Sequence, residues 1–466
     1  MVAGLKTDHG RPGRVIRYRK WLSAGIPAGF YRSLSWQYVG SLWAIFAGGL
    51  YSIFIGRGLG AADFGLITLG LSSVTLVFLM ASLRLHEVVI RYVAEFWEHG
   101  DRERTLAMVK LSFTADLSAC VLALLLVACL SPFAEAHLLR DRRSVTVLWL
   151  SAFSVFFVNL GNATSIGILR VFGDFKTQSL VSITTTTFKL ALSLAGVFLL
   201  GWRVRGVLVA ALASSALSGM CLMSAAIWRL NKYVPLRHTS APITLLRPRL
   251  AEIARFARSL YFLSLTGIPT KELDVNILGF FAPLHVVGTY KIAKNFMTGV
   301  WALADPTLFV VYPELARMWS RRDITAMKVF VHRLTAILGV CGVVIFAGAF
   351  AVVPRMIQYV LGDAFHQSGV IFCAMLWPVV IWFPLQWLHP LLMAAGRPDL
   401  TLRAAIAESV IVTVLYLILI PKVGAMGAAF VYALATPLVL LFGLWLGRRA
   451  GLLFPPCPVV ETSAAA

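Results

Sequence analysis

Long apolar runs separated by short polar breaks fill most of this chain. A helix needs roughly 20 mostly apolar residues to cross a bilayer core, and the chain offers about twelve segments of that kind. We expect them near residues 36–55, 64–85, 108–130, 146–169, 177–201, 206–228, 256–282, 286–312, 332–353, 367–395, 402–420 and 424–447. The pattern predicts an all-α integral membrane protein with about twelve transmembrane helices.

Composition and charge agree with a membrane protein. Hydrophobic residues make up 59% of the 466 residues and charged residues only 14%, which excludes an ordinary soluble domain. If the N-terminus is inside, the cytoplasmic segments carry several times as many Lys and Arg residues as the outer loops. We therefore assign the net charge of +21 to contact with anionic lipid headgroups rather than to nucleic acid. Both termini are predicted to be cytoplasmic.

The two halves of the chain show signs of an internal repeat. A shift of 223 residues superposes four glycine pairs, which are Gly56 on Gly279, Gly65 on Gly288, Gly173 on Gly396 and Gly201 on Gly424. AEFWEHGD at 94–101 also resembles ARMWSRRD at 316–323. Since each half has six expected spans, both enter the membrane in the same direction, and a substrate path is expected between them.

This repeat divides the chain into domains. The predicted parts are a basic cytoplasmic arm (1–35), a six-helix bundle (36–230), a cytoplasmic linker (231–255), a second six-helix bundle (256–447) and a cytoplasmic tail (448–466).

Charged residues inside the expected spans are the main candidates for function. The stretch TKELDVNILGFF at 270–281 holds Lys271, Glu272 and Asp274. Ionisable side chains are costly in hydrocarbon, so they turn toward a protein or water-filled interior and often mark a substrate path. With Lys189, Lys291 and Lys294, Lys271 is predicted to form a cationic cleft that binds an anionic cargo.

Other polar and aromatic residues in the spans form two further groups of candidates. The possible sugar contacts are Asn159, Asn162, Gln386, Trp382 and Trp387. The possible sites of coupling to a proton or sodium gradient are Asp116, Glu272, Asp274, Asp305, His389 and Glu408.

Structural roles are the alternatives for these residues. An ion pair of Lys271 with Asp274 would only lock helices together, and Lys291 and Lys294 lie close enough to the outer surface to snorkel. The asparagines and tryptophans could serve helix packing. No Cys or His spacing suits a metal, and no nucleotide-binding or nucleophile motif is present. The chain is therefore predicted to be a carrier without a cofactor rather than an enzyme.

The chain contains the stretches FIGRGLGAADFGL, RYVAEF, LDVNILGFFAPLHVVGTYKIAKNF, YVLGDAF, MAAGRPD and IPKVGAMGAAFVYALA. These stretches resemble the Wzx-type polysaccharide flippases of the multidrug/oligosaccharidyl-lipid/polysaccharide exporter superfamily. The resemblance implies twelve helices in a bacterial inner membrane and the flipping of undecaprenyl-pyrophosphate-linked oligosaccharides for O-antigen, capsule or exopolysaccharide synthesis. It also implies partners such as a polysaccharide polymerase and a chain-length regulator.

Two other functions are compatible with part of the pattern. A multidrug or organic-cation exporter of the same superfamily would share the fold, although the lysines within the spans argue against cationic cargo. A membrane-embedded glycan polymerase or ligase would be expected to carry a large outer loop rich in arginine, and the expected outer loops hold few basic residues.

Overall fold

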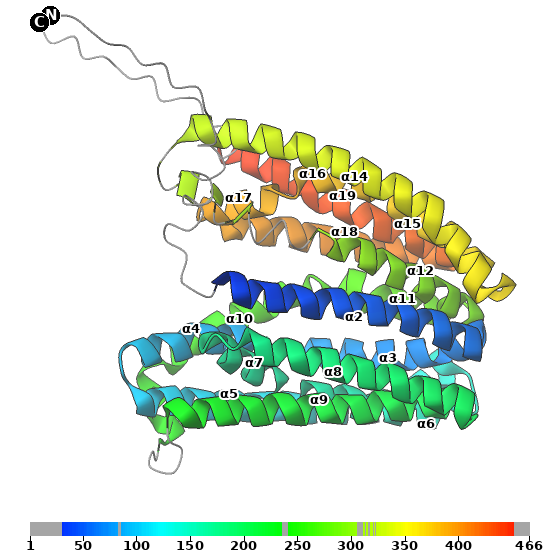
Figure 1. Cartoon of the computed structure of the whole chain (residues 1–466), viewed down its shortest axis with the longest axis horizontal. Coiled ribbons are helices and arrows are strands. Elements are labelled where there is room, and N and C mark those ends of the chain that lie inside the picture. Colours follow the sequence, from blue (N-terminus) through cyan, green and yellow to red (C-terminus); the bar gives the residue numbers. More distant parts are fainter. Residues whose placement is uncertain are drawn as a thin grey trace, which may run out of the picture.

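A computed structural model describes residues 30–82, 85–234, 241–304 and 311–451, apart from 313, 316, 320 and 322. All regular structure in these ranges is helical (Figure 1). The α-helices are α2 (Phe30–Leu59), α3 (Ala61–Ala81), α4 (Leu85–Glu98), α5 (Arg102–Ala134), α6 (Ser144–Asn159), α7 (Asn162–Val171), α8 (Phe175–Leu194), α9 (Arg203–Tyr233), α10 (Leu250–Leu265), α11 (Asp274–Phe281), α12 (Leu284–Ala302), α14 (Ile324–Leu361), α15 (His366–Leu376), α16 (Pro378–Leu385), α17 (Leu388–Ala394), α18 (Pro398–Val423) and α19 (Ala425–Arg449). Short 3₁₀ or π turns are η1 (Glu135–Leu139), η2 (Ala195–Leu199), η3 (Ile243–Arg249), η4 (Pro269–Leu273) and η5 (Asp363–Phe365).

Ten helical stretches of the described chain are long and apolar enough to cross a membrane. They correspond to ten of the expected spans, which confirms the all-α membrane fold. The two other expected spans are 256–282, which forms α10, η4 and α11, and 286–312, whose described part is α12. The exact number of twelve and the cytoplasmic location of the termini stay predictions.

The span expected at 256–282 is broken at its middle. Pro269 begins η4, a π-helical turn that separates α10 from α11. Proline lacks an N–H group and collides with the carbonyl four residues earlier, which favours an interruption of the α-helix at this position. The break places Lys271 and Glu272 on the π-helical turn and Asp274 at the start of α11.

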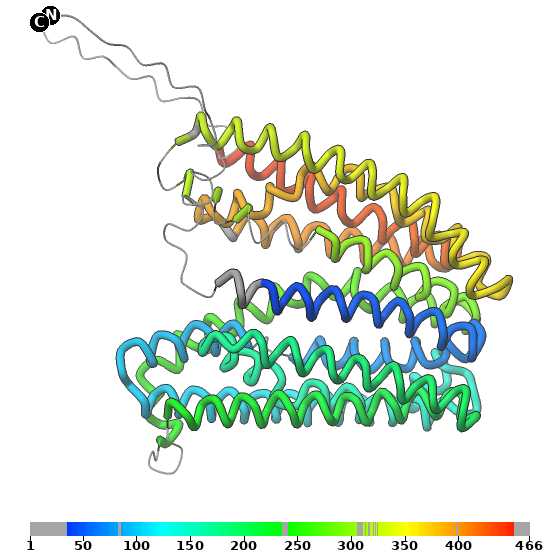
Figure 2. The backbone as a smooth tube through the Cα atoms, in the orientation of Figure 1, coloured from blue at the N-terminus to red at the C-terminus, as the bar shows by residue number. Residues whose placement is uncertain are grey.

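The helices form two groups that lie side by side. In Figure 1, α2 to α9 occupy the lower part of the molecule and α14 to α19 the upper part, and the backbone trace in Figure 2 follows the same division. Contacts of α12 with α3 and α2 join the groups. α10 packs beside the first half, since Ile253 and Phe256 belong to the same apolar cluster as Leu85 of α4. The domain boundary at residue 256, within α10, therefore stays a prediction.

Equivalent positions of the two halves have the same local geometry. Asp101 and Asp323 each cap the following helix by accepting a hydrogen bond from the backbone N–H three residues later, at 2.9 Å in both cases. Gly201 and Gly424 both have a positive φ, of 64° and 62°, which glycine reaches without a Cβ penalty. These matches support the internal repeat.

α3 and α12 approach each other closely at two glycines that are equivalent under the repeat. A Cβ atom on Gly65 of α3 would collide with the carbonyl oxygen of Leu284, and one on Gly288 of α12 would collide with the carbonyl oxygen of Ala61. Positions 61 and 65 correspond to 284 and 288 under the shift of 223 residues. A reciprocal contact of this kind is the mark of a two-fold relation, so an approximate two-fold axis passes between α3 and α12.

Candidate substrate cleft

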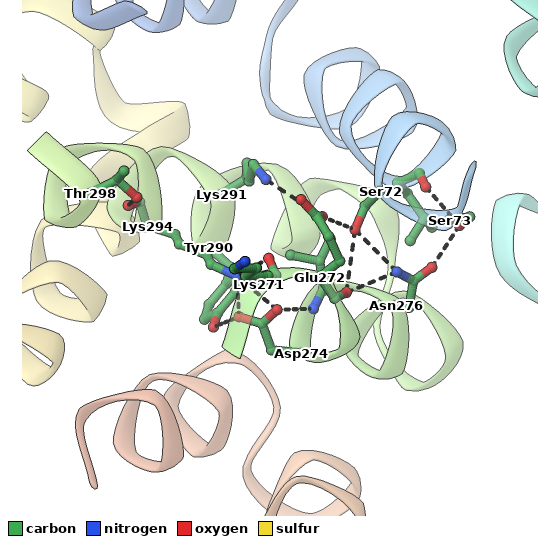
Figure 3. Close-up of polar contacts among 12 residues, drawn as sticks. Ser72, Ser73, Lys271, Glu272, Asp274, Asn276, Tyr290, Lys291, Lys294 and Thr298 are labelled. Carbon is green, nitrogen blue, oxygen red and sulfur yellow. Dashed lines mark hydrogen bonds and ion pairs between the residues drawn. The ribbon is translucent and has the colours of Figure 1, made fainter. Parts of the chain in front are cut away.

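Asp274 lies at the centre of the buried polar cluster between α11 and α12. Its carboxylate is fully buried, accepts a hydrogen bond from Tyr290 Oη at 2.5 Å and lies 2.6 Å from Lys294 Nζ (Figure 3). Lys294 Nζ also donates to the carbonyl oxygen of Lys271 at 2.7 Å. Asp274 is therefore paired with Lys294 rather than with Lys271, and Lys294 is 6% exposed and does not snorkel.

Glu272 links the two halves of the chain. Ser72 Oγ of α3 donates to Glu272 Oε2 at 2.5 Å, while Asn276 Nδ2 donates to Ser72 Oγ at 3.1 Å (Figure 3). Ser73 Oγ donates to Asn276 Oδ1 at 2.7 Å. Lys291 Nζ lies 4.0 Å from Glu272 Oε2, at the outer limit of an ion pair. Sequence patterns did not single out Ser72, Ser73, Asn276 or Tyr290, and the only signal for the serines is their polarity within an apolar span.

Two adjoining cavities of about 680 and 780 Å³ surround these residues. They share Thr75, Glu272, Lys291, Asn295 and Thr298, and we call them together the cleft. Their volumes fall in the range of ligand pockets, roughly 300–1,000 Å³. The cleft is large enough for a headgroup rather than a single ion.

Three lysines of the cleft are not held by Asp274. Lys271 lines the smaller cavity, Lys189 the larger one, and Lys291 both. The Lys189 ammonium lies 4.9 Å from the centre of the Tyr51 ring. Within the described ranges, no acidic side chain lies within ion-pair distance of Lys189 or Lys271. With Glu272 and Glu408 as the acidic residues that line the cavities, the lining carries an excess of positive charge.

The predicted sugar contacts do not line the cleft. Asn159 Nδ2 donates to the carbonyl oxygen of Val155 in its own helix at 2.8 Å, and Asn162 begins α7. Trp387 Nε1 donates to Thr335 Oγ1 at 2.9 Å. Trp382 and Gln386 line a separate pocket of about 230 Å³.

The candidates for ion coupling are also dispersed. Asp116 accepts hydrogen bonds from the N–H and Oγ1 of Thr164, at 3.0 and 2.6 Å, and so caps the start of α7. Glu408 lines the smaller cavity of the cleft, whereas His389 lines the separate pocket. Asp305 lies outside the described residues. In the part of the chain that the structure describes, no group of three or more His, Cys, Asp and Glu side chains is arranged to hold a metal ion.

Comparison with known proteins identifies the family. A model of the family described as "Polysaccharide biosynthesis protein" matches residues 54–369. The search of curated proteins finds no match.

Solved structures of transporters share the fold. A MATE-family multidrug resistance transporter of the MOP superfamily, solved in an inward-facing conformation, has a TM-score of 0.69 at 15% identity, over 88% of this chain and 95% of that chain. The lipid II flippase MurJ, in an inward closed conformation, has a TM-score of 0.67 at 13% identity, over 88% and 87%. A MOP-superfamily transporter from Pyrococcus furiosus has a TM-score of 0.60 at 14% identity, over 90% and 96%. The chain therefore belongs to the polysaccharide biosynthesis protein family and has the fold of the MOP-superfamily transporters.

Proposed function

We propose that this membrane transporter is a flippase for undecaprenyl-pyrophosphate-linked oligosaccharides in a bacterial inner membrane. The observation that carries the proposal is the cleft, in which Lys189, Lys271 and Lys291 surround cavities of about 680 and 780 Å³ between the two groups of helices. A pyrophosphate group must lose water to cross the membrane, and ammonium groups can replace that hydration. The family description and the lipid flippase among the structural neighbours support a lipid-linked cargo.

The mechanism follows from the chemistry of the lysines and the repeat. Lysine ammonium groups are mobile point charges that bind phosphate without the rigid fork of arginine, which suits a cargo that must also be released. The glycan-pyrophosphate would occupy the cleft from the cytoplasmic side while the lipid tail stays in the bilayer. Rocking of the two helix groups about the α3–α12 contact would then open the cleft to the outside. A polymerase and a chain-length regulator would act on the delivered units.

Sidedness of the lipid-linked glycan tests the proposal. Cells that lack the protein are complemented with wild type, Lys189→Ala, Lys271→Ala or Lys291→Ala, and a membrane-impermeant probe measures glycolipid on each face. We expect glycolipid to accumulate inside, and each lysine variant to lower the flipping rate about tenfold or more, because a hydrogen bond to a charged group is lost. Lys422→Ala, at the last turn of α18, is the matched control.

Two results would contradict the proposal. Unchanged sidedness without the protein would exclude the flippase function in those cells. Normal sidedness together with hypersensitivity to organic cations would favour the multidrug exporter, whose cargo the acidic Glu272 and Glu408 would then bind.

A further inference from the structure

A second pocket lies within the second half of the chain, apart from the cationic cleft. It has a volume of about 230 Å³ and is bounded by residues of α16, α17, α18 and α19 together with Gln386, which lies between α16 and α17. We call it the side pocket. Its polar lining consists of Trp382, Gln386, His389 and Thr401, and the other residues are apolar.

Two polar side chains of the side pocket have no partner in the described structure. Gln386 is 2% exposed, and both its Oε1 and Nε2 atoms are buried without a hydrogen bond. Thr401 Oγ1 is buried without a partner as well. Each buried polar group without a hydrogen bond lowers the stability of the folded protein by about 1–3 kcal/mol. Native proteins therefore rarely leave buried polar groups without a hydrogen-bond partner. These unpaired donors and acceptors belong to residues that line the side pocket, so they are available for a ligand.

The backbone is interrupted at the same place. The expected span 367–395 is broken at Gln386 and Trp387, between α16 and α17, and Pro384 and Pro390 lie on either side. The corresponding span of the first half, 146–169, is broken between α6 and α7 at Gly161. Helices that are interrupted in corresponding spans of two repeats point to a binding site in transporters of this architecture.

The side pocket adjoins the cleft. Val439 of α19 lines both the side pocket and the smaller cavity of the cleft. Trp301 lines the cleft and packs edge-to-face against Trp382 of the side pocket, with ring centres 5.1 Å apart. The side pocket and the cleft are therefore neighbouring cavities, with this tryptophan pair between them.

The chemistry of the side pocket defines its ligand. The pocket has no Asp, Glu, Lys or Arg in its lining, so a charged ligand would stay unpaired there. The Gln386 amide and the Thr401 hydroxyl both donate and accept, which matches hydroxyl groups. Trp382 offers an apolar ring to the C–H face of a sugar, and about 230 Å³ is below the size of pockets for drug-sized ligands.

We propose that the side pocket binds one uncharged sugar residue of the cargo while the pyrophosphate occupies the cationic cleft. This inference rests on the proposed function, and it adds a site that recognises the glycan to a site that recognises the phosphate. Recognition by buried hydrogen bonds makes the transporter selective, because a cargo without the matching sugar leaves Gln386 and Thr401 unpaired.

The test compares two kinds of probe on the full chain in nanodiscs. The affinity for undecaprenyl diphosphate without sugar reports binding to the cleft alone. The affinity for undecaprenyl diphosphate bearing one hexose, N-acetylhexosamine or 6-deoxyhexose reports binding to the cleft and the side pocket together. We expect wild type to bind at least one sugar-bearing probe about tenfold more tightly than the sugar-free probe. Gln386→Met and Thr401→Val should abolish this advantage and leave the affinity for the sugar-free probe unchanged.

A stability measurement separates recognition from a structural role. Because Gln386 has no partner, Gln386→Met should leave the melting temperature unchanged or raise it. Ser368→Ala is the matched control, since Ser368 is also buried and unpartnered but does not line the side pocket. This control should keep the preference for the sugar-bearing probe.

The possible outcomes distinguish the two proposals. If wild type binds all the probes equally, or if Gln386→Met weakens all of them equally, the sugar site is refuted, while the flippase proposal stands. If neither kind of probe binds, both proposals fall.

Discussion

At the scale of single residues, Lys294 and Lys271 are predicted to have different roles although both line the cleft. Lys294 is buried against Asp274, and removal of one partner leaves an uncompensated charge, which costs about 3–5 kcal/mol. We expect Lys294→Met to lower the unfolding free energy by that amount in detergent, and the double variant Lys294→Met/Asp274→Asn to recover much of it.

Lys271→Met should change stability by less than about 1 kcal/mol and impair transport. Equal destabilisation by both single variants would refute this division of roles.

A second residue-scale prediction concerns pH. Asp141 lies between η1 and α6, and hydrogen bonds from the Arg143 guanidinium, at 3.0 Å, lower the pKa of this carboxyl below its ordinary value. A lowered pKa stabilises the folded state above the unfolded value, about 3.9, and this stabilisation is lost as pH falls through the folded pKa. The contribution of Asp141 to the melting temperature should therefore be fully present and constant between roughly pH 5 and pH 7, and it should be lost below about pH 4. Asp141→Asn should lack this acid-dependent loss.

The sequence indicated that the charged residues inside the span at 256–282 are candidates for function, but it did not indicate how they pair. The alternative of an ion pair between Lys271 and Asp274 assumed the angular spacing of an α-helix. Lys271 belongs instead to the π-helical turn η4, and Asp274 begins α11, so the two side chains do not share a helix face in the expected way. The partner of Asp274 comes from α12, 20 residues further along the chain, and such a contact depends on packing between helices.

At the scale of elements, Asp116 acts as a cap for α7 although it lies on α5. Its Oδ2 accepts from the backbone N–H and the hydroxyl of Thr164, in the first turn of a helix that starts after Gly161. We expect Asp116→Ala to destabilise the protein by about 1–2 kcal/mol, as the loss of a capping group does. Asp116→Asn keeps an accepting oxygen and should retain most of the stability and transport, as melting and flipping assays can show. Loss of transport in a stable Asp116→Asn protein would favour ion coupling.

Hydropathy predicted the existence of the spans better than their interruptions. The stretches 146–169 and 367–395 are apolar throughout, but the structure breaks them into α6–α7 and α15–α16–α17. Averaging over a span conceals a single residue such as Gly161, whose left-handed conformation separates α6 from α7. Gln386 and Trp382 were grouped with the cleft because the breaks in their span were not predicted. In the structure, the breaks place these two residues in a pocket of their own.

At the scale of the whole molecule, the α3–α12 contact is predicted to hold the two helix groups together at one end. Gly56 of α2 lies near Leu361 and Phe365 at this end, and the adjacent Gly58 lies near Val197. The carbonyl oxygens that face Gly65 and Gly288 belong to the backbone, so they cannot turn aside as a flexible side chain would. A single methyl group at either glycine must therefore separate the helices.

Gly65→Ala and Gly288→Ala are consequently expected to open this end of the molecule by similar amounts, since the two glycines meet across the approximate two-fold axis. Spin labels at Leu199 and Tyr359, which are 83% and 92% exposed, report on the separation. Their mean distance should lengthen by about 2 Å or more, because helices that lack a glycine contact pack at roughly 8–10 Å, and transport should fall. Gly48→Ala, where a Cβ atom meets nothing within 4 Å, is the control and should change neither. An unchanged distance in both variants would show that rocking does not pivot on this contact.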